Sequence, residues 1–258
     1  MTDSVSWLMI AGVIVSYLLG NISPATIMGR IYGVDIRKAG SGNPGTTNTL
    51  REIGPKAAAV TLLIDILKGV AGAAIGYALS PGGLWMYVCG TAVFLGHIWP
   101  VFYRFKGGKG IATGFGVMLF IDWRLALCLL ITAGVGAFIS KRMSIGSVAA
   151  AVAVPILFGI TRGPGFAVWG AAIGLIIIWR HRGNIQRIIR HEEPKISFLD
   201  KDNKSKKEKS RDSSADVKSA PATEDMNTIS YTDDPDPSDQ AADEGNEVSR
   251  KDKNRDDK

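Results

Sequence analysis

The sequence predicts an all-α integral membrane protein with seven transmembrane helices, an N-terminus outside the cell and a C-terminus in the cytoplasm. Three observations support this fold class. Apolar stretches that suit a bilayer follow one another through residues 1–198. Lys and Arg are concentrated in alternate connections between these stretches. The remaining residues, 199–258, have a different composition with very few large apolar side chains.

Composition divides the 258 residues into two parts, although the average is 46% hydrophobic and 21% charged. Residues 1–198 hold 18 Lys or Arg and 7 Asp or Glu, a net charge of +11, whereas residues 199–258 hold 12 and 17, a net charge of −5. We therefore expect a membrane-embedded domain at 1–198 and a charged, disordered cytoplasmic tail at 199–258, which buries too little apolar surface to offset its chain entropy. Because the positive charge lies in the membrane part, no nucleic-acid partner is expected.

Seven apolar stretches qualify as spans, although the fourth has only 13 residues. The connections that follow them carry 5, 0, 3, 1, 2, 1 and 4 Lys or Arg. Since cytoplasmic loops are enriched in these residues, the alternation gives the orientation stated above and requires the short fourth span. No Lys or Arg precedes the first stretch, which favours a retained span over a cleaved signal peptide. We therefore expect a multi-pass protein of the plasma membrane. The candidate spans are residues 5–22, 56–79, 83–99, 110–122, 125–140, 144–160 and 164–180.

Some residues inside the spans predict how the helices pack. Asp65 and Lys68 are three residues apart in the second span, where charges facing lipid would be costly, so we expect them to face the bundle interior and to pair. Whether that pair is structural or functional stays open from the sequence. Glycines one turn apart allow close helix approach; they are Gly72 with Gly76 and Gly170 with Gly174.

Three polar segments fall on the predicted cytoplasmic face, and their convergence favours one shared site for a substrate that carries phosphate. The first polar segment, residues 38–54, reads KAGSGNPGTTNTLREIG. The second, residues 96–116, reads GHIWPVFYRFKGGKGIATGFG. The third, residues 180–193, reads RHRGNIQRIIRHEE.

The first polar segment contains a formal dinucleotide-binding fingerprint, formed by Gly40, Gly42 and Gly45. The fingerprint has meaning only in a strand–turn–helix unit, and here it lies between two membrane helices, so we exclude it. Its glycines still expose backbone N–H groups to an anion, and the short polar side chains around them add further partners. Arg51 offers a bidentate cationic fork to the same anion.

The second polar segment departs from the P-loop pattern, because no Ser or Thr follows Lys109 and the spacing is different. Gly107 and Gly108 nevertheless allow close backbone approach, and Lys106 and Lys109 provide cations at the start of a helix. A solvated turn that merely obeys the positive-inside rule is the alternative for this segment taken alone.

The third polar segment leaves the last span. If that helix continues, Arg180, His181, Asn184 and Arg187 fall on neighbouring faces at three- and four-residue spacing. A basic stripe against anionic lipid headgroups is the alternative interpretation of the same pattern.

Other chemistries find little support in the sequence. Its histidines, His97, His181 and His191, have no Cys or carboxylate cluster at ligand spacing, so we expect neither a metal site nor a cofactor. Cys89 and Cys128 lie in apolar stretches and are expected to be small buried hydrophobes rather than a disulfide. No G-x-S-x-G motif occurs, and neither His97 nor His181 is followed, after four intervening residues, by the acid of the His-x4-Asp acyltransferases.

The three polar segments resemble the three signature motifs of the acyl-phosphate:glycerol-3-phosphate acyltransferases, the PlsY family. The pattern S-G-N-x-G-A-T-N-x-x-R resembles residues 41–51, with Thr46 in place of the usual alanine. The pattern G-H-x-x-P-x-F-x-x-F-K-G-G-K-G is matched at residues 96–110. The third pattern, R-H-x-x-N-I-x-R followed by a glycine and a glutamate, is matched from residue 180, with His191 in place of the glycine and Glu193 in the acid's place.

This resemblance covers residues 5–198 and implies transfer of a fatty acyl group from acyl phosphate to the 1-hydroxyl of glycerol 3-phosphate. The products are lysophosphatidic acid and phosphate, the first acylation of phospholipid synthesis, with no cofactor. The implied partners are the two substrates, the lipid bilayer and the enzyme that produces acyl phosphate. The implied catalytic residues are Ser41, Arg51, Lys109, His181 and Asn184. The implied substrate-binding residues are Gly42, Asn43, Gly45, Thr47, Asn48, His97, Lys106, Gly107 and Gly108.

The proton of the attacking hydroxyl has three candidate acceptors, namely His181, His97 and a phosphate oxygen of the donor. Because acyl phosphate is a mixed anhydride whose leaving group departs readily, no covalent enzyme intermediate is required. For the proton we favour the phosphate oxygen, which would accept it as the new bond forms.

Two other functions compete with acyl transfer. A transporter of a phosphorylated metabolite would also need a basic site among membrane helices, but its site should lie near the midplane between repeated halves, and the sequence has no internal repeat. A structural membrane protein whose polar segments only bind headgroups is the second alternative.

Overall fold

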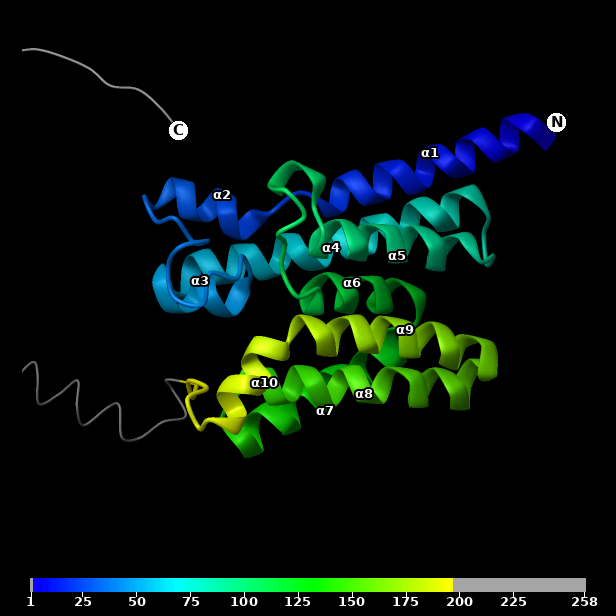
Figure 1. Cartoon of the computed structure of the whole chain (residues 1–258). Coiled ribbons are helices and arrows are strands. Elements are labelled where there is room, and N and C mark those ends of the chain that lie inside the picture. Colours follow the sequence, from blue (N-terminus) through cyan, green and yellow to red (C-terminus); the bar gives the residue numbers. More distant parts are fainter. Residues whose placement is uncertain (1, 197–258) are drawn as a thin grey trace, which may run out of the picture. The chain divides into compact units, whose positions relative to one another are not determined.

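The computed structural model describes residues 2–196, which form ten α-helices, one 3₁₀ turn and no strand (Figure 1). The all-α prediction is therefore confirmed for these residues, whereas the predicted tail at 199–258 lies outside them. The helices are α1 (Thr2–Gly20), α2 (Pro24–Ile31), α3 (Thr46–Glu52), α4 (Pro55–Leu79), α5 (Trp85–Ile98), α6 (Ile111–Ile121), α7 (Trp123–Ser140), α8 (Met143–Arg162), α9 (Pro164–Arg180) and α10 (Arg182–Ile189), with the 3₁₀ turn η1 (Val101–Tyr103) after α5.

The number of helices that suit a bilayer is five, or six if α9 and α10, bent by 57°, count as one span. A helix coincides with each of the seven predicted stretches, and α6 corresponds to the short fourth one. The 11 residues of α6 rise only about 16 Å, well short of a hydrocarbon core of about 30 Å. The coarser prediction of a multi-span helical membrane protein is thus confirmed, and the count of seven remains a prediction.

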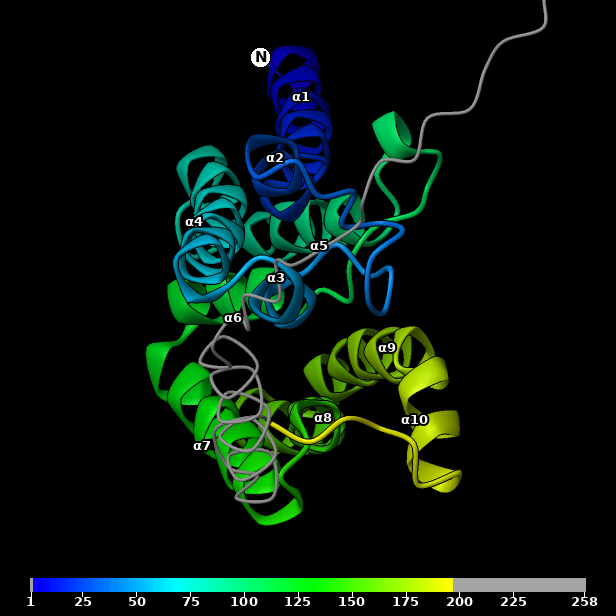
Figure 2. The same ribbon diagram turned by 90° about the vertical axis from the view of Figure 1, so that its left-hand side faces the viewer.

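The helices pack as two neighbouring groups. Helices α1, α4, α5 and α6 contact one another, and α8 contacts both α7 and α9 (Figure 2). The α6–α7 connection joins the groups, and their cores are continuous, since the buried Val93 of α5 and Phe158 of α8 belong to one apolar cluster. A second cluster brings Phe94 and Ile98 of α5 against Ile173 of α9, directly beneath the second polar segment.

Close helix contacts occur at the glycines that the sequence singled out for packing. A Cβ added at Gly72 would collide with Val93, and one added at Gly76 would collide with the backbone of Trp85. Gly170 and Gly174 lie in the same way against the backbone of α8. The small residues therefore let α4 approach α5 and α9 approach α8, which confirms the prediction.

The two cysteines differ in their surroundings. Both are free, and Cys89 is buried as expected. Cys128 is exposed, so the prediction of burial is wrong for it. The reason is its place on α7, which carries the exposed Leu127, Leu130 and Ile131 on the side that no other described helix covers.

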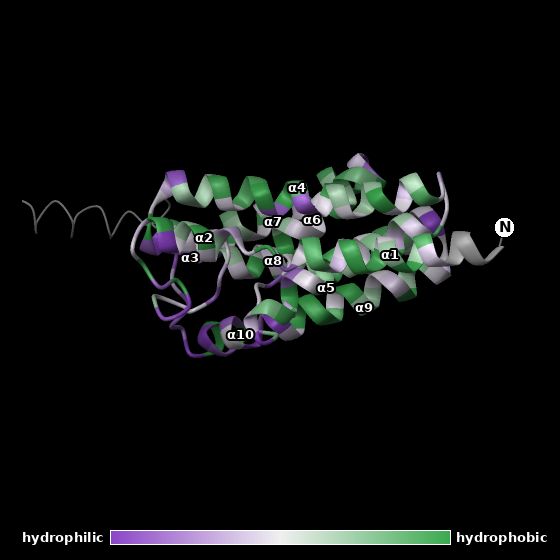
Figure 3. Cartoon of the chain, turned by 90° about the horizontal axis from the view of Figure 1, so that it is seen from above, coloured by the Kyte–Doolittle hydropathy of each residue, from purple (hydrophilic) through white to green (hydrophobic). Residues whose placement is uncertain are grey.

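Hydrophilic residues gather at one end of the helices, around α2, α3 and α10, while α1 begins at the opposite end (Figure 3). Between the ends the surface is apolar, with exposed side chains such as Leu63 on α4, Phe138 on α7 and Leu175 on α9. An apolar band of this kind suits lipid contact and leaves the polar end facing water.

Candidate functional site

The first polar segment is a loop shaped around the side chain of Asn48, which is only 2% exposed. Its Oδ1 accepts hydrogen bonds from the backbone N–H of Ser41 at 2.9 Å and from the Ser41 hydroxyl at 3.1 Å. Its Nδ2 donates to the carbonyls of Ile36 and Ala39, both at 3.1 Å. Since these four bonds use the whole capacity of the amide, Asn48 fixes the loop and leaves substrate contact to its neighbours.

Backbone geometry in this loop depends on glycine. Gly40 and Gly42 have φ values of 55° and 67°, in the left-handed region that side chains rarely adopt. A Cβ at Gly42 would also lie 2.9 Å from the carbonyl oxygen of Arg37. The resulting turn leaves Ser41 exposed, with Asn43 and Thr47 half-buried beside it.

The second polar segment folds back onto the end of α5. The backbone N–H groups of Gly107 and Gly108 each donate at 3.1 Å, to the carbonyls of Ile98 and His97 respectively. Arg180 of the third polar segment closes the loop from the other side, since its Nη2 and Nε donate to the carbonyls of Gly107 at 2.7 Å and Gly108 at 3.1 Å. A side chain at Gly107 or Gly108 would collide with His97, so the glycines permit this contact.

The third polar segment is bent, and the conditional prediction of a continuous helix is wrong. The α9 helix ends at Arg180, and α10 leaves it at 57°. The last turn of α9 is tightened, because the backbone N–H of His181 bonds the carbonyls of both Ile177 and Ile178. The His181 ring lies only 2.8 Å, through Nδ1, from the Ile177 carbonyl, which can only accept, so Nδ1 carries a proton and Nε2 is unprotonated in the neutral ring.

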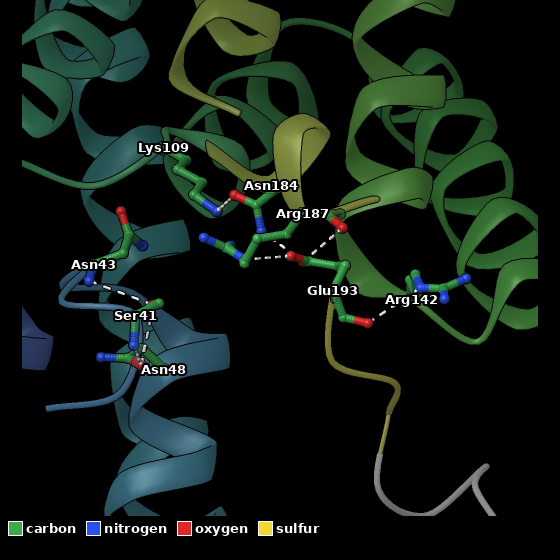
Figure 4. A network of polar contacts seen from close by, with 9 residues as sticks. Ser41, Asn43, Asn48, Lys109, Arg142, Asn184, Arg187 and Glu193 are labelled. Atoms are coloured by element: carbon green, nitrogen blue, oxygen red, sulfur yellow. Dashed lines mark hydrogen bonds and ion pairs between the residues drawn. The ribbon is translucent and has the colours of Figure 1, made fainter. Parts of the chain in front are cut away.

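The bend directs α10 toward Glu193, the centre of a buried polar network (Figure 4). Glu193 Oε1 accepts hydrogen bonds from Asn184 Nδ2 at 2.6 Å and Ser144 Oγ at 2.8 Å, and its Oε2 pairs with Arg187 Nε at 2.8 Å. Burial raises the pKa of Glu193, but these three donors outweigh it and hold the pKa below its usual range. The ionised carboxylate thereby orients Asn184, whose Oδ1 accepts a hydrogen bond from Lys109 Nζ.

Lys109 lies where positive charge is in excess. Burial is the largest cause that lowers its pKa, to about 8, and the positive charges of Arg187, Arg180 and Arg51 lower it further against the opposing effect of Glu193. Four cations are therefore electrostatically coupled here to one buried carboxylate. Such an imbalance favours binding of an anion.

The structure joins the three polar segments unequally. The second and third are in direct contact through Arg180 and Lys109. Arg37, the residue directly before the first segment, contacts the second: its Nη1 donates to the Lys106 carbonyl at 2.5 Å, and its guanidinium lies 4.4 Å from the centre of the Tyr103 ring. Within residues 2–196 no hydrogen bond joins the first and third segments, although the charge of Arg51 in the first acts on Lys109 in the second.

Other residues at the site were not assigned roles from the sequence. Arg37 entered the sequence analysis only as one of the positive charges of its loop. No sequence pattern predicts a role for Ser144, because its hydrogen-bond partner Glu193 is 49 residues away. The predicted Asp65–Lys68 pair is confirmed at 2.8 Å, and it is buried next to His97.

A sequence comparison now identifies the family. The family model described as glycerol-3-phosphate acyltransferase matches residues 10–191, which contain all three polar segments up to His191. The chain belongs to the glycerol-3-phosphate acyltransferase family. The resemblance inferred from the motifs is thereby confirmed, and membership of an enzyme family leaves the transporter alternative without support.

Individual members of the acyltransferase family cover the same part of the chain. The glycerol-3-phosphate acyltransferase of Prochlorococcus marinus (strain MIT 9211) is 38% identical over 196 residues, which cover 72% of this chain and 93% of the relative. That of Thioalkalivibrio sulfidiphilus (strain HL-EbGR7) is 42% identical over 183 residues, covering 70% and 90%.

Solved structures of the family share the fold of this acyltransferase. The crystal structure of PlsY (YgiH), an integral membrane glycerol 3-phosphate acyltransferase, in its glycerol 3-phosphate form, is similar with a TM-score of 0.68 and 34% identity, covering 72% of this chain and 94% of that one. The lysophosphatidic acid form of the same protein gives a TM-score of 0.67 and 32% identity.

Proposed function

We propose that the chain transfers a fatty acyl group from acyl phosphate to the 1-hydroxyl of glycerol 3-phosphate, giving lysophosphatidic acid and inorganic phosphate. The observation that supports this most directly is the excess of cations around Lys109, where three arginines act on its pKa and one buried carboxylate opposes them. Both substrates carry phosphate, so a productive complex must hold two like-charged groups close together. A cationic site whose lysine and two of whose arginines are half-buried reduces their repulsion.

We assign the acyl-phosphate head to the first polar segment and glycerol 3-phosphate to the second and third. Arg51 and Lys109 neutralise phosphate charge between them, and the Lys109–Asn184–Glu193 chain fixes one of the cations in place. The residues assigned to the acyl phosphate are Ser41, Gly42, Asn43, Gly45, Thr47 and Asn48, the last as the residue that shapes the loop. Those assigned to glycerol 3-phosphate and the developing oxyanion are His97, Lys106, Gly107, Gly108, His181 and Asn184.

The reaction needs no covalent enzyme intermediate. The 1-hydroxyl oxygen attacks the carbonyl carbon, the new ester C–O bond forms, and the C–O bond to phosphate breaks with its electron pair leaving on the phosphate. The hydroxyl proton passes to a phosphate oxygen of the donor, so charge and atoms balance within the two substrates. The protein contributes by bringing the reactants together and by stabilising the negative charge that develops on the carbonyl oxygen.

We infer that the chain crosses the plasma membrane with seven segments, including the short α6, and that the polar end faces the cytoplasm. Lys and Arg occur in and beside α2, α3 and α10, which lie at the hydrophilic end of the helices (Figure 3), and this supports the orientation. Acyl phosphate would then arrive on the side where it is made, which favours contact with the enzyme that produces it. The proposed reaction is the first acylation of phospholipid synthesis.

The activity is tested by purifying the protein into lipid nanodiscs and supplying glycerol 3-phosphate with either palmitoyl phosphate or palmitoyl-CoA. We expect phosphate and lysophosphatidic acid in equal amounts from palmitoyl phosphate and no product from palmitoyl-CoA. Arg51→Ala should lose activity, whereas the matched variant Arg190→Ala, an exposed arginine with no assigned role, should keep it. Transfer from palmitoyl-CoA alone would refute the proposed donor.

The orientation is tested with single cysteines introduced into a Cys128→Ser background. A membrane-impermeant maleimide added to intact cells should label Pro81→Cys, in the uncharged connection after α4, and spare Lys38→Cys until the cells are lysed. Both positions are exposed. Labelling of Lys38→Cys in intact cells would contradict a cytoplasmic site.

A further inference from the structure

A buried ion pair, Asp65 with Lys68, lies against His97 of the second polar segment, and the reaction described above gives the pair no role. Lys68 Nζ lies 2.8 Å from Asp65 Oδ1, and their side chains are 3% and 2% exposed. His97 joins them, with Nδ1 2.8 Å from Lys68 Nζ and 3.4 Å from Asp65 Oδ1. Ionised side chains inside a helical membrane bundle are costly, so their presence calls for a function.

The hydrogen bonds of Lys68 determine which ring nitrogen of His97 carries the proton. An ammonium group has three donors and no acceptor. Besides His97 Nδ1, Lys68 Nζ has hydrogen-bond partners in the carbonyl oxygens of Ile22 at 2.7 Å and Gly20 at 3.2 Å. Because the ammonium has no acceptor, Nδ1 must accept in its hydrogen bond with Nζ, and the proton of the neutral ring lies on Nε2.

Asp65 contributes negative charge to this arrangement. Its Oδ1 is buried, 2.8 Å from the Lys68 ammonium and 3.4 Å from His97 Nδ1. A carboxylate at this distance keeps Lys68 protonated in an otherwise apolar environment. A protonated Lys68 is required for all three donors to exist.

The free edge of His97 faces the glycine loop. A Cβ added at Gly108 would collide with His97 Nε2, so this nitrogen lies against the loop that Lys106 and Lys109 flank. Among residues 2–196 Nε2 has no hydrogen-bond partner, and it is not among the fully enclosed unpartnered atoms. An N–H donor is thus presented at the edge of the cationic site.

We propose that Asp65 and Lys68 are positioning residues that hold His97 as the Nε2–H tautomer, so that His97 donates a hydrogen bond to the phosphate of glycerol 3-phosphate. The proposal rests on the proposed acyl transfer and makes it more specific. It removes His97 from the candidate bases, because its unprotonated nitrogen is occupied by Lys68. The alternative to this positioning role is a purely structural one. In it, Lys68 only donates to the carbonyls at the break between α1 and α2.

The tautomer is measured directly by ¹⁵N NMR of histidine-labelled protein in nanodiscs. The chain has three histidines, so His181→Gln and His191→Gln assign the His97 signals. We expect a protonated Nε2 and an unprotonated Nδ1, and a shift of the Nε2 signal when glycerol 3-phosphate alone is added. A protonated Nδ1, or an Nε2 signal that glycerol 3-phosphate leaves unchanged, would overturn the proposal without need of a variant.

A kinetic arm uses the paired substitution Asp65→Asn with Lys68→Met, which removes both charges and so leaves no lone buried ion. We expect the KM for glycerol 3-phosphate to rise roughly tenfold, as for loss of one hydrogen bond to a charged group, and the KM for acyl phosphate to stay within about twofold. The matched control is Arg162→Gln, which breaks the 2.8 Å pair with Asp122 at the other end of α8 from Ser144. An unchanged KM in the paired variant would refute the positioning role.

The two arms separate this proposal from the proposed function. If the wild-type protein transfers no acyl group, the proposed function fails, whereas the tautomer and the response of Nε2 to glycerol 3-phosphate are still observed. If the enzyme is active but its His97 has the other tautomer, only the positioning proposal fails.

Discussion

At the residue scale, the ammonium of Lys109 is largely buried and is repelled by the positive charges of three neighbouring arginines. Its pKa is lowered to about 8, so its charge is present below that pH and is lost above it. Because the charged form binds phosphate, we expect kcat/KM to fall about tenfold per pH unit above pH 8. Lys109→Arg keeps its charge throughout and should remove this alkaline decline even if it is slower at pH 7.

The pH profile is measured with palmitoyl phosphate at constant ionic strength, with the stability of the donor checked at each pH. Arg104→Lys, at an exposed position of the same loop, serves as the matched control and should decline like the wild type. An alkaline decline that persists unchanged in Lys109→Arg would assign the titration to another group.

Thr46 is the one departure from the family pattern in the first polar segment, and it has a physical cost. Its hydroxyl is buried without a hydrogen-bond partner within residues 2–196. Leaving such a group unpaired costs about 1–3 kcal/mol, so Thr46→Ala should leave the free energy of unfolding unchanged or raise it by about 1 kcal/mol, with activity retained.

Thr49→Ala is the matched control for Thr46→Ala, since the Thr49 hydroxyl donates to the Gly45 carbonyl at 3.1 Å. It should lower the free energy of unfolding by about 1 kcal/mol. Thermal denaturation in one detergent compares the two variants. Greater destabilisation by Thr46→Ala than by Thr49→Ala would show that the Thr46 hydroxyl has a partner after all.

At the element scale, Glu193 connects α10 to α8. Glu193→Gln removes the ion pair with Arg187 while keeping an acceptor for Ser144, and we expect a loss of about 2 kcal/mol in the free energy of unfolding. Because the pKa of Glu193 is lowered by folding, its contribution is complete above the ordinary glutamate value of about 4.3 and is lost as the pH falls through the lower folded value.

Thermal denaturation of wild type and Glu193→Gln from about pH 7 down to about pH 2.5 checks this dependence, because the loss is expected below the ordinary glutamate value. The difference between them should shrink toward the acid end. Glu192→Gln, at the exposed neighbouring position, should behave as the wild type does. A difference that grows with acidity would contradict the lowered pKa.

Arg37 connects the first polar segment to the loop after η1. We expect Arg37→Ala to loosen residues 36–43 and to raise the KM for acyl phosphate about fivefold, since one hydrogen bond and one cation–π contact are lost. Hydrogen exchange of peptides from this loop measures the first effect. Lys38→Ala, whose side chain is 87% exposed, is the control and should change neither quantity. Unaltered exchange in Arg37→Ala would refute the connection.

The sequence predicts the helices far better than the contacts between polar segments. Apolar length predicts a helix at each of the seven apolar stretches, because it depends on neighbouring residues alone. The bend at His181 was missed because the residues on both sides suit a helix equally well, and the tightened last turn depends on the fold. The Arg37–Lys106 and Ser144–Glu193 contacts join residues 69 and 49 positions apart, so no local pattern reveals them.

At the scale of the whole described unit, the arrangement of the helices explains why the site lies at one end. Helices α1, α4, α5 and α6 carry the first two polar segments, and α9 with α10 carries the third (Figure 1). The site therefore lies where the two groups of helices meet. The proposed water-soluble acceptor and lipid donor would meet at such a boundary between the polar end and the apolar surface.

Direct acyl transfer at this boundary is tested most directly with palmitoyl phosphate that carries ¹⁸O in the oxygen bridging carbon and phosphorus. Attack of the glycerol 3-phosphate hydroxyl on the carbonyl carbon predicts that all of the label leaves in inorganic phosphate and that lysophosphatidic acid has none. Mass spectrometry of both products after a single turnover decides the matter. Label in lysophosphatidic acid, or release of labelled palmitate in its place, would contradict the account.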